Sequence, residues 1–462
     1  MVARGNSLQA RDIASLVHPY TNLKTHLTDG PVVMGRGKGI FVYDDAGKEY
    51  IEGLAGLWST SLGWGEERLV EAATRQLRTL GTYHIFAGKS HEPGIELAER
   101  LLAMAPVPMS KVFFANSGSE ANDTAIKLVW YYNNALGRPQ KKKIISRQRA
   151  YHGVTIATAS LTGLPANHRD FDLPIANIIH TECPSHYLFA QSGESEDAFT
   201  TRMAESLEQL IQKEGPDTCA AFIAEPVMGA GGVIIPPAGY FEKIQKVLKK
   251  YDILMIADEV ICGFGRTGNM FGTTTFGLKP DMITVAKALS SAYLPISGLM
   301  VSEEIFQALV KESEKIGVFA HGYTYSAHPV AAAVAIETLK IYEERDILGH
   351  VKAVSPRFVQ GMKKLAQHPL VGEAQAVGLI GAVQLVKAKA PKTLFEPTQP
   401  IGPYMAKRAE HHGLICRTLL GHRVALCPPL VISDAQIDDM LRRFALALDD
   451  TAAMVSEKGL AA

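Results

Sequence analysis

Seven short, uniformly apolar runs separated by helical stretches constrain the fold of this chain more than any other feature. Strands that are apolar on both sides are buried on both faces, which is typical of a mostly parallel sheet covered by helices. We therefore expect a large α/β domain over residues 65–328, built on a seven-stranded sheet. The runs cover residues 112–114, 143–145, 177–179, 220–224, 253–257, 282–285 and 298–301.

The segments on either side predict a second, smaller domain. Residues 40–52 have the pattern of a β-hairpin and belong to an N-terminal segment, residues 1–64. After residue 328 a long helix is expected to about residue 344, followed by further helices and apolar runs. We expect residues 1–64 and 329–462 to form a smaller α+β domain together.

Two local patterns refine the C-terminal part. The stretch 387–403 is rich in Ala, Pro, Lys and Thr, which predicts a surface loop. Ser433, with Gln436 three residues later, has the spacing of a capping box and marks the start of the last helix.

Charge and cysteine content exclude several classes of protein. Lys plus Arg and Asp plus Glu are both 47, so the net charge is zero, which argues against nucleic acid or an anionic membrane as the main partner. No apolar run approaches the about 18 residues of a membrane span. The five cysteines include no CxxC pair, and the N-terminus lacks the apolar core of a secretory signal. We expect a cytoplasmic protein without a metal site.

The turn from Asn116 to Asn122 follows the run 112–114 and opens a helix that is expected to reach about residue 136. Free backbone amides and the positive end of the helix dipole make such a turn an anion site. When the turn is considered alone, simple helix capping is the slightly better explanation. No Walker loop and no GxGxxG fingerprint occurs at a strand–helix turn.

Three ionisable residues end two of the apolar runs. Asp258 and Glu259 follow the run 253–257, and Lys287 follows the run 282–285. Ligands of open parallel sheets bind outside the carboxyl ends of the strands. Adjacent strand residues point to opposite faces, so only one of the two acids is expected to face a ligand.

The combination is more specific than its parts. An anion cradle, a carboxylate and a lysine at one sheet edge are the groups that pyridoxal phosphate needs for its phosphate, its pyridine nitrogen and its Schiff base. A lysine alone at a strand end would be interpreted as a surface side chain. The three together predict a pyridoxal phosphate site.

With these motifs in place, the sequence resembles the class III aminotransferases of pyridoxal-phosphate fold type I, and within them the amine and ω-amino acid–pyruvate enzymes. The resemblance covers nearly the whole chain. It differs after the lysine, where Ala288 replaces the usual glycine. The matching motifs are Asn116–Asn122, Tyr151–Gly153, Glu225–Pro226 with Gly229–Gly232, Asp258–Val260 with Gly263–Gly268, Lys287, His321–Ser326 and Arg417.

The resemblance implies a role for each matched residue. Lys287 would carry the cofactor as a Schiff base, and Asp258 would pair with the pyridine nitrogen. The other implied cofactor contacts are Ser117, Gly118 and Ser119 at the phosphate, Tyr151 and Val260 on the two ring faces, His152 and Glu225 close by, and Thr324 from a neighbouring subunit. The implied substrate contacts are Trp58, Tyr151, Ala230, Arg417 for a carboxylate, and Phe86 from the partner subunit.

The expected activity is a ping-pong transfer of an amino group from an amine or ω-amino acid to a keto acid, with pyruvate as the expected acceptor. The shared sites imply a homodimer or a dimer of dimers. A mutase or a dialkylglycine-type decarboxylase of the same fold would use the same lysine and aspartate and stays open as an alternative. A cofactor-holding regulator and a nicotinamide dehydrogenase are disfavoured, because no basic DNA-binding segment occurs and no GxGxxG motif follows a first strand.

Overall fold

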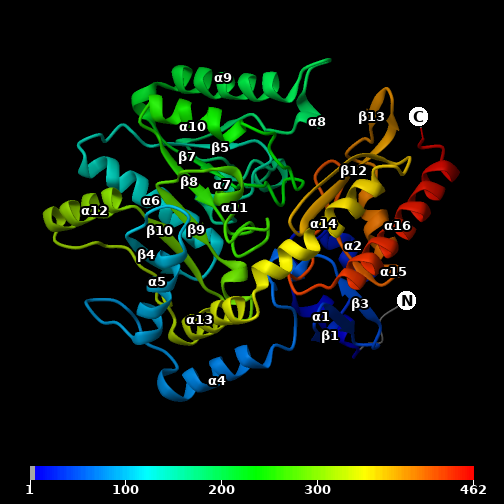
Figure 1. The fold of residues 1–462 in the computed structure, drawn as a ribbon, viewed down its shortest axis with the longest axis horizontal. Coiled ribbons are helices and arrows are strands. Elements are labelled where there is room, and N and C mark those ends of the chain that lie inside the picture. The colour runs from blue at the N-terminus through cyan, green and yellow to red at the C-terminus, as the bar shows by residue number, and fades with distance from the viewer. Residues whose placement is uncertain (1–5, 462) are drawn as a thin grey trace.

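The structure, a computed structural model, describes residues 6–461 (Figure 1). Within them a seven-stranded sheet has the order β4–β10–β9–β8–β7–β5–β6. β10 is antiparallel to both neighbours, and the other pairs are parallel. The expected α/β architecture is confirmed. The strands are β4 (Lys111–Ala115), β5 (Lys143–Arg147), β6 (Ile178–Thr181), β7 (Cys219–Ala224), β8 (Leu254–Asp258), β9 (Met282–Val285) and β10 (Ser297–Val301).

Helices cover both faces of this sheet, which explains why its strands are apolar throughout. Helices α9 (Glu196–Glu214) and α10 (Tyr240–Lys250) lie on one face, and α6 (Gly118–Ala135) and α12 (Glu303–Ile316) on the other (Figure 1). On β7, Phe222 packs in the core beneath α9 and α10, whereas Ala221 and Ile223 pack beneath α6. Successive side chains of β7 therefore point to opposite faces of the sheet, and both faces are buried.

Two further sheets build the smaller domain from both ends of the chain. The short strand β14 pairs in parallel with β3, so that Ile415 is the partner of Glu52. The N-terminal hairpin and the C-terminal part thus share one sheet, as expected, while the exact boundaries at 64/65 and 328/329 stay predictions. The first sheet is β1 (Met34–Lys38), β2 (Phe41–Asp44), β3 (Glu49–Glu52) and β14 (Leu414–Ile415), and the second is β11 (Val371–Val377), β12 (Ile380–Lys389), β16 (Arg423–Leu426) and β15 (Arg417–Leu419), with β13 (Lys392–Leu394) paired to β12.

The prediction of a surface loop over residues 387–403 is wrong in part. β12 continues to Lys389 and turns into β13, and a helix begins at Ile401. The alternation of Val386, Lys387, Ala388 and Lys389 fits a strand with one solvated face, which the lysine-rich composition concealed.

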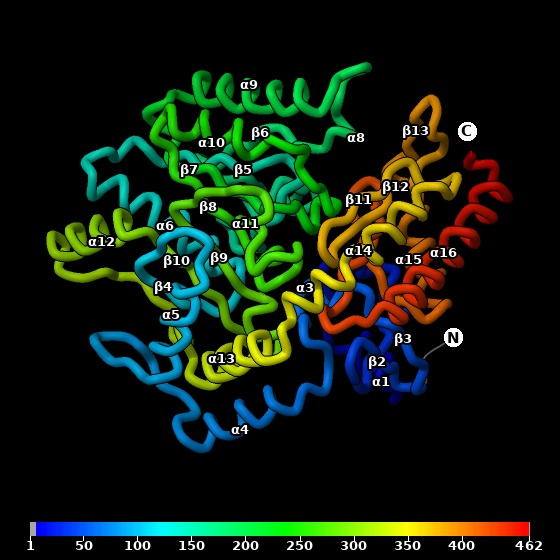
Figure 2. Tube along the Cα trace, viewed as in Figure 1, coloured from blue at the N-terminus to red at the C-terminus, as the bar shows by residue number. Residues whose placement is uncertain are grey.

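The remaining helices connect and cover these sheets, and the trace in Figure 2 shows α13 and α14 leading from the large sheet to the smaller domain. The capping box of Ser433 and Gln436 is confirmed at the start of α16. No helix among residues 6–461 is long and apolar enough to span a bilayer. These helices are α1 (Leu8–Ser15), α2 (Leu23–Asp29), α3 (Ala55–Trp58), α4 (Glu67–Leu80), α5 (Glu92–Met104), α7 (Ile156–Leu161), α8 (His186–Phe189), α11 (Gly272–Phe276), α13 (Pro329–Glu344), α14 (Ile347–Leu365), α15 (Ile401–His411), α16 (Asp434–Glu457), and the 3₁₀ turns η1 (Pro165–Asn167), η2 (Pro216–Thr218) and η3 (Lys287–Ser290).

Candidate active site

A cavity of about 800 Å³ lies at the carboxyl ends of the central strands. Residues of the smaller domain, from both ends of the chain, complete its wall. All the site residues that the sequence predicted, except Phe86 and Thr324, line this cavity: Trp58, Ser117, Gly118, Ser119, Tyr151, His152, Glu225, Ala230, Asp258, Val260, Lys287 and Arg417.

The start of α6 forms an anion cradle at the cavity wall. Ser117 is the N-cap, and its hydroxyl oxygen accepts a hydrogen bond of 3.2 Å from the amide of Glu120. The amides of Gly118 and Ser119, in the first turn, have no partner within the helix. A Cβ at Gly118 would lie 2.9 Å from Cγ1 of Val260, so only glycine allows the cradle to approach that side chain. This geometry suits a phosphate group.

Asp258 ends β8 and is almost fully buried, with 3% of its surface exposed. Its Oδ2 accepts hydrogen bonds from Nδ1 of His152 over 2.7 Å and from Nδ2 of Asn122 over 2.8 Å. Its Oδ1 accepts one from the amide of Val260 over 3.1 Å. Glu259 turns away and caps α11, accepting from the amide of Gly272. The expectation that only one acid faces the ligand is therefore confirmed.

Asn122 is a site residue that the sequence analysis did not assign a role. It lies one helical turn after Ser119 and so shares the face of α6 that looks into the cavity. Besides Asp258, it donates to the backbone oxygen of His152 over 2.9 Å. Within the described residues, Oδ1 of Asn122 and Nε2 of His152 are buried without a hydrogen-bond partner. Both residues line the cavity.

Lys287 follows β9 and begins the 3₁₀ turn η3 in the left-handed backbone region, with φ of 48°. Such a conformation is strained for a residue with a side chain and is typical of functional sites. Burial lowers the pKa of Lys287 to about 8, against the opposing effect of the carboxylates of Asp258 and Glu225. An amine with this pKa is neutral in part near physiological pH, which is a requirement for a nucleophile or a base.

Glu225 organises the loops on the far side of the cavity. Its Oε1 accepts a hydrogen bond of 3.0 Å from the amide of Tyr151, and its Oε2 one of 2.9 Å from the amide of Gly229. Burial raises the pKa of Glu225. One carboxyl group thus holds both the loop that carries Tyr151 and the loop that carries Ala230.

The smaller domain supplies an apolar wall and a cation. Trp58 is 2% exposed and adopts a φ of 64°, and Arg417 begins β15. Tyr20, which the sequence analysis did not place in the site, also lines the cavity, with its ring centre 5.9 Å from the guanidinium carbon of Arg417. The hydroxyl of Tyr20 accepts a hydrogen bond of 2.7 Å from Nδ2 of Asn167.

Buried Glu52 supports the segment that carries Trp58. Its Oε2 accepts a hydrogen bond from the amide of Gly56, which lies in the non-helical kink of α3. Burial raises the pKa of Glu52 to about 8. This carboxyl group, too, was not singled out from the sequence.

Phe86 and Thr324 do not line the cavity. Phe86 is 44% exposed, and Thr324 is exposed as well. A Cβ at Gly322 would lie 2.7 Å from Cζ of Phe86, so the ring packs on the segment that leads to Thr324. The two residues thus belong to one surface region of the chain, away from the cavity formed by the same chain.

The cradle, the buried carboxylate and the lysine of lowered pKa surround one cavity. This set fits pyridoxal phosphate. The family described as aminotransferase class-III matches residues 24–448. The chain belongs to the class-III aminotransferases. Its cofactor is pyridoxal 5'-phosphate, and the family assignment favours amino transfer over the mutase and decarboxylase alternatives.

Relatives and solved structures agree with this assignment. The chain is 51% identical over 459 residues to gamma aminobutyrate transaminase 3, chloroplastic, of Solanum lycopersicum, covering 98% of this aminotransferase and 88% of the relative. The omega transaminase from Pseudomonas jessenii in complex with PMP superposes with a TM-score of 0.96 at 54% identity, over 98% of this chain and 99% of the other. A structure described as a transaminase with L-ala has a TM-score of 0.90 at 56% identity, over 92% and 100% of the two chains.

Proposed function

We propose that this aminotransferase moves an amino group from an amine or ω-amino acid to pyruvate by a ping-pong mechanism. The observation that carries the proposal is the pairing of an apolar wall at Trp58 with the guanidinium of Arg417 in one cavity. An apolar wall suits the body of an amine donor, and a guanidinium grips a carboxylate with two parallel hydrogen bonds. Support comes from the relative named for γ-aminobutyrate, an ω-amino acid, and from the structure that contains L-alanine, which is aminated pyruvate.

The cofactor, when bound, supplies an aldehyde for the amine and a ring that stabilises negative charge at the substrate carbon. The chain supplies the rest. The amides at the start of α6 would hold the phosphate, and Asp258 would hold a proton on the pyridine nitrogen. Asn122 and His152 fix the carboxylate of Asp258 through their hydrogen bonds to Oδ2. Nζ of Lys287, neutral in part because burial lowers its pKa to about 8, takes the proton from the substrate carbon and later returns it.

The acceptor half of the reaction depends on Arg417. Burial lowers the pKa of Arg417 below its ordinary value, but an arginine stays charged at neutral pH. Because Arg417, Trp58 and Tyr20 line the same cavity, one site serves both an apolar donor and a carboxylate. We propose that the guanidinium turns away from the cavity when a donor without a carboxylate enters.

We propose further that two chains associate so that Phe86 and Thr324 of each reach the cavity of the other. The support is their exposure in one surface region that lies away from the cavity of their own chain. Sedimentation should show a dimer or a dimer of dimers, and a fully active monomer would contradict this arrangement. We also propose a cytoplasmic location, supported by five free cysteines. Cell fractionation tests the location.

The test of the activity is a panel of donors and acceptors with the cofactor-loaded enzyme. γ-Aminobutyrate and 1-phenylethylamine serve as donors with and without a carboxylate, and pyruvate and 2-oxoglutarate serve as acceptors. We expect alanine from pyruvate with both donors and little glutamate from 2-oxoglutarate. Preferential formation of glutamate would contradict pyruvate as the acceptor, and release of carbon dioxide from the donor would contradict simple amino transfer.

A further inference from the structure

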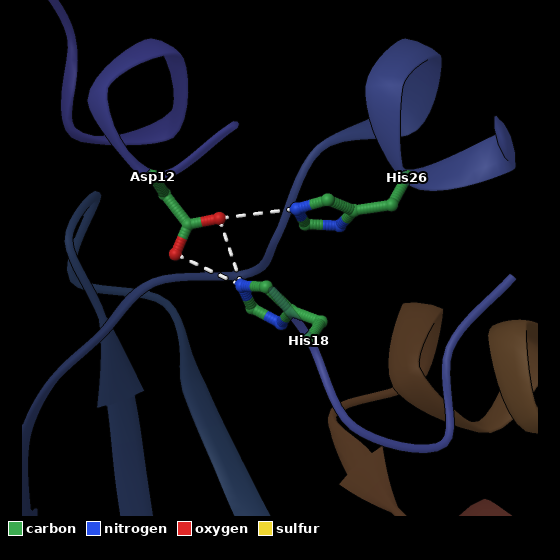
Figure 3. Close-up of side chains that lie close together, drawn as sticks. All are labelled: Asp12, His18 and His26. Atoms are coloured by element: carbon green, nitrogen blue, oxygen red, sulfur yellow. Dashed lines mark hydrogen bonds and ion pairs between the residues drawn. The ribbon is translucent and has the colours of Figure 1, made fainter. Parts of the chain in front are cut away.

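Outside the active site, two imidazoles and a carboxylate converge near the N-terminus (Figure 3). Asp12 lies on α1, His18 on the following connection and His26 on α2. Nε2 of His18 is 2.8 Å from Oδ1 of Asp12, and Nε2 of His26 is 3.1 Å from the same oxygen. Within residues 6–461 this is the one group of three His, Cys, Asp or Glu side chains whose ligand atoms all lie within 4.8 Å of one another.

The geometry is close to that of a metal site. Zn²⁺ binds imidazole nitrogen and carboxylate oxygen at about 2.0–2.2 Å, which places tetrahedral ligands about 3.3 Å apart. The two Nε2–Oδ1 distances would have to widen by only a few tenths of an ångström. Imidazoles favour zinc and its transition-metal neighbours over Mg²⁺ or Ca²⁺. The spacing of these three residues matches no common sequence motif, so the sequence analysis predicted no metal.

Burial and ring placement also suit an ion. His26 is 7% exposed, and the side chains of Asp12 and His18 are 16% and 29% exposed, which leaves one side open to water. A hydrogen bond between a carboxylate and an imidazole requires only one histidine, so it does not explain a second one. Here a second ring lies with its centre 4.2 Å from the first, and both rings direct Nε2 at the same carboxylate. With Nε2 bound to an ion, each ring would keep its proton on Nδ1.

We propose that Asp12, His18 and His26 bind one divalent transition metal ion, Zn²⁺ by preference, with water in the remaining position. The proposal is independent of the donor and acceptor proposed above. The ion would close a loop from residue 12 to residue 26, and Tyr20 lies within this loop and lines the cavity. Metal binding would therefore hold the Tyr20 segment against the active site.

The experiment is a zinc titration of the cofactor-loaded enzyme with its purification tag removed, in competition with a chromophoric chelator. We expect one ion per chain. His18→Gln combined with His26→Gln should weaken binding by at least about tenfold, since two of three ligands are lost. His411→Gln, which changes an exposed histidine far along the chain, is the control and should bind like the wild type. Equal zinc affinity in the wild type and the double variant would overturn the site.

Two measurements keep the test independent of how the variant folds. Co²⁺ added to the wild type should give the intense visible absorption of tetrahedral coordination, and a spectrum of aqueous octahedral Co²⁺ would overturn the proposal. Hydrogen exchange at the amides of residues 12–26 should slow when Zn²⁺ is added to the wild type. Unchanged exchange with zinc bound would show that the ion does not close this loop.

Discussion

The side-chain amide of Asn122 donates to Oδ2 of Asp258 over 2.8 Å, across 136 residues of sequence. His152 donates to the same oxygen, so Oδ2 is held by two side-chain donors while Oδ1 is held by a backbone amide. The carboxylate is thereby fixed before any ligand enters. Such preorganisation removes the need to reorient the carboxylate during the reaction.

Asp258→Asn should bind the cofactor and lose most of its turnover. Asparagine has the same shape but cannot hold a proton on the pyridine nitrogen. A charge-assisted hydrogen bond of about 1.5–3 kcal/mol corresponds to a loss of about ten- to 150-fold. Stopped-flow absorption of the donor half-reaction measures the loss. Turnover near that of the wild type would show that Asp258 is not the ring partner.

Asn122→Ala should reduce the same rate by less, about fivefold, because it removes one neutral hydrogen bond of about 1 kcal/mol from Asp258. Asn122→Asp puts a second carboxylate next to the first and should be more damaging than alanine. The half-reaction rate of each variant checks this order. Equal rates for Asn122→Ala and the wild type would mean that His152 alone suffices to hold Asp258.

Cofactor capture by the cofactor-free enzyme should accelerate as the pH rises through about 8. The amine attacks only when neutral, and burial lowers the pKa of Lys287 from 10.5 to about 8, so the neutral fraction rises over that range and levels off above it. The rate of the absorption change on adding pyridoxal phosphate measures capture. Borohydride reduction and peptide mapping should then find the label on Lys287. A midpoint near 10.5, or a label on another lysine, would refute the assignment.

Arg417→Ala should slow the pyruvate half-reaction strongly and leave the half-reaction of 1-phenylethylamine nearly unchanged. The guanidinium contacts a carboxylate, which only pyruvate carries. Each half-reaction is followed separately, from the amino form and from the aldehyde form of the cofactor. Arg417→Lys is the matched variant, since it keeps the charge and loses the paired hydrogen bonds. Equal losses in both halves would make Arg417 a structural residue.

Glu52→Gln should stabilise the fold at high pH relative to the wild type. The pKa of Glu52 in the folded state, about 8, lies above its ordinary value of 4.5. The contribution of Glu52 to the free energy of unfolding is therefore complete below about pH 4.5 and declines as the pH rises to about 8. Glutamine has no proton to lose. The difference in melting temperature between variant and wild type should therefore grow from pH 5 to pH 8.5. The exposed Glu99→Gln is the control and should show no such trend.

The sequence predicts the large sheet well because burial on both faces leaves a plain pattern of apolar runs. It also predicts the residues that end these strands, since parallel strands bring Asp258 and Lys287 to one edge without any knowledge of side-chain geometry. The hairpin at Lys389 was missed because one of its faces is solvated, so composition alone resembled a loop.

Other site residues need the folded chain. Asn122 ends the motif Asn116–Asn122, but only its position one turn after Ser119 could have indicated its role. Tyr20 reaches the cavity through contacts with the distant residues Asn167 and Arg417, for which a single sequence carries no signal. The role of Glu52 depends on its burial, which its sequence neighbourhood does not indicate. The assignments of Phe86 and Thr324 depend on a second chain and stay predictions.

The pairing of β3 with β14 has a consequence for biosynthesis. Trp58 is synthesised long before Arg417, so the substrate pocket cannot form until translation has passed residue 417. In contrast, the last strand of the large sheet ends at Val301, so this sheet can form earlier during translation. A nascent chain could thus acquire the cofactor cradle and its lysine before it can discriminate among substrates. Shortening the C-terminus ahead of residue 414 should then separate cofactor retention from substrate choice.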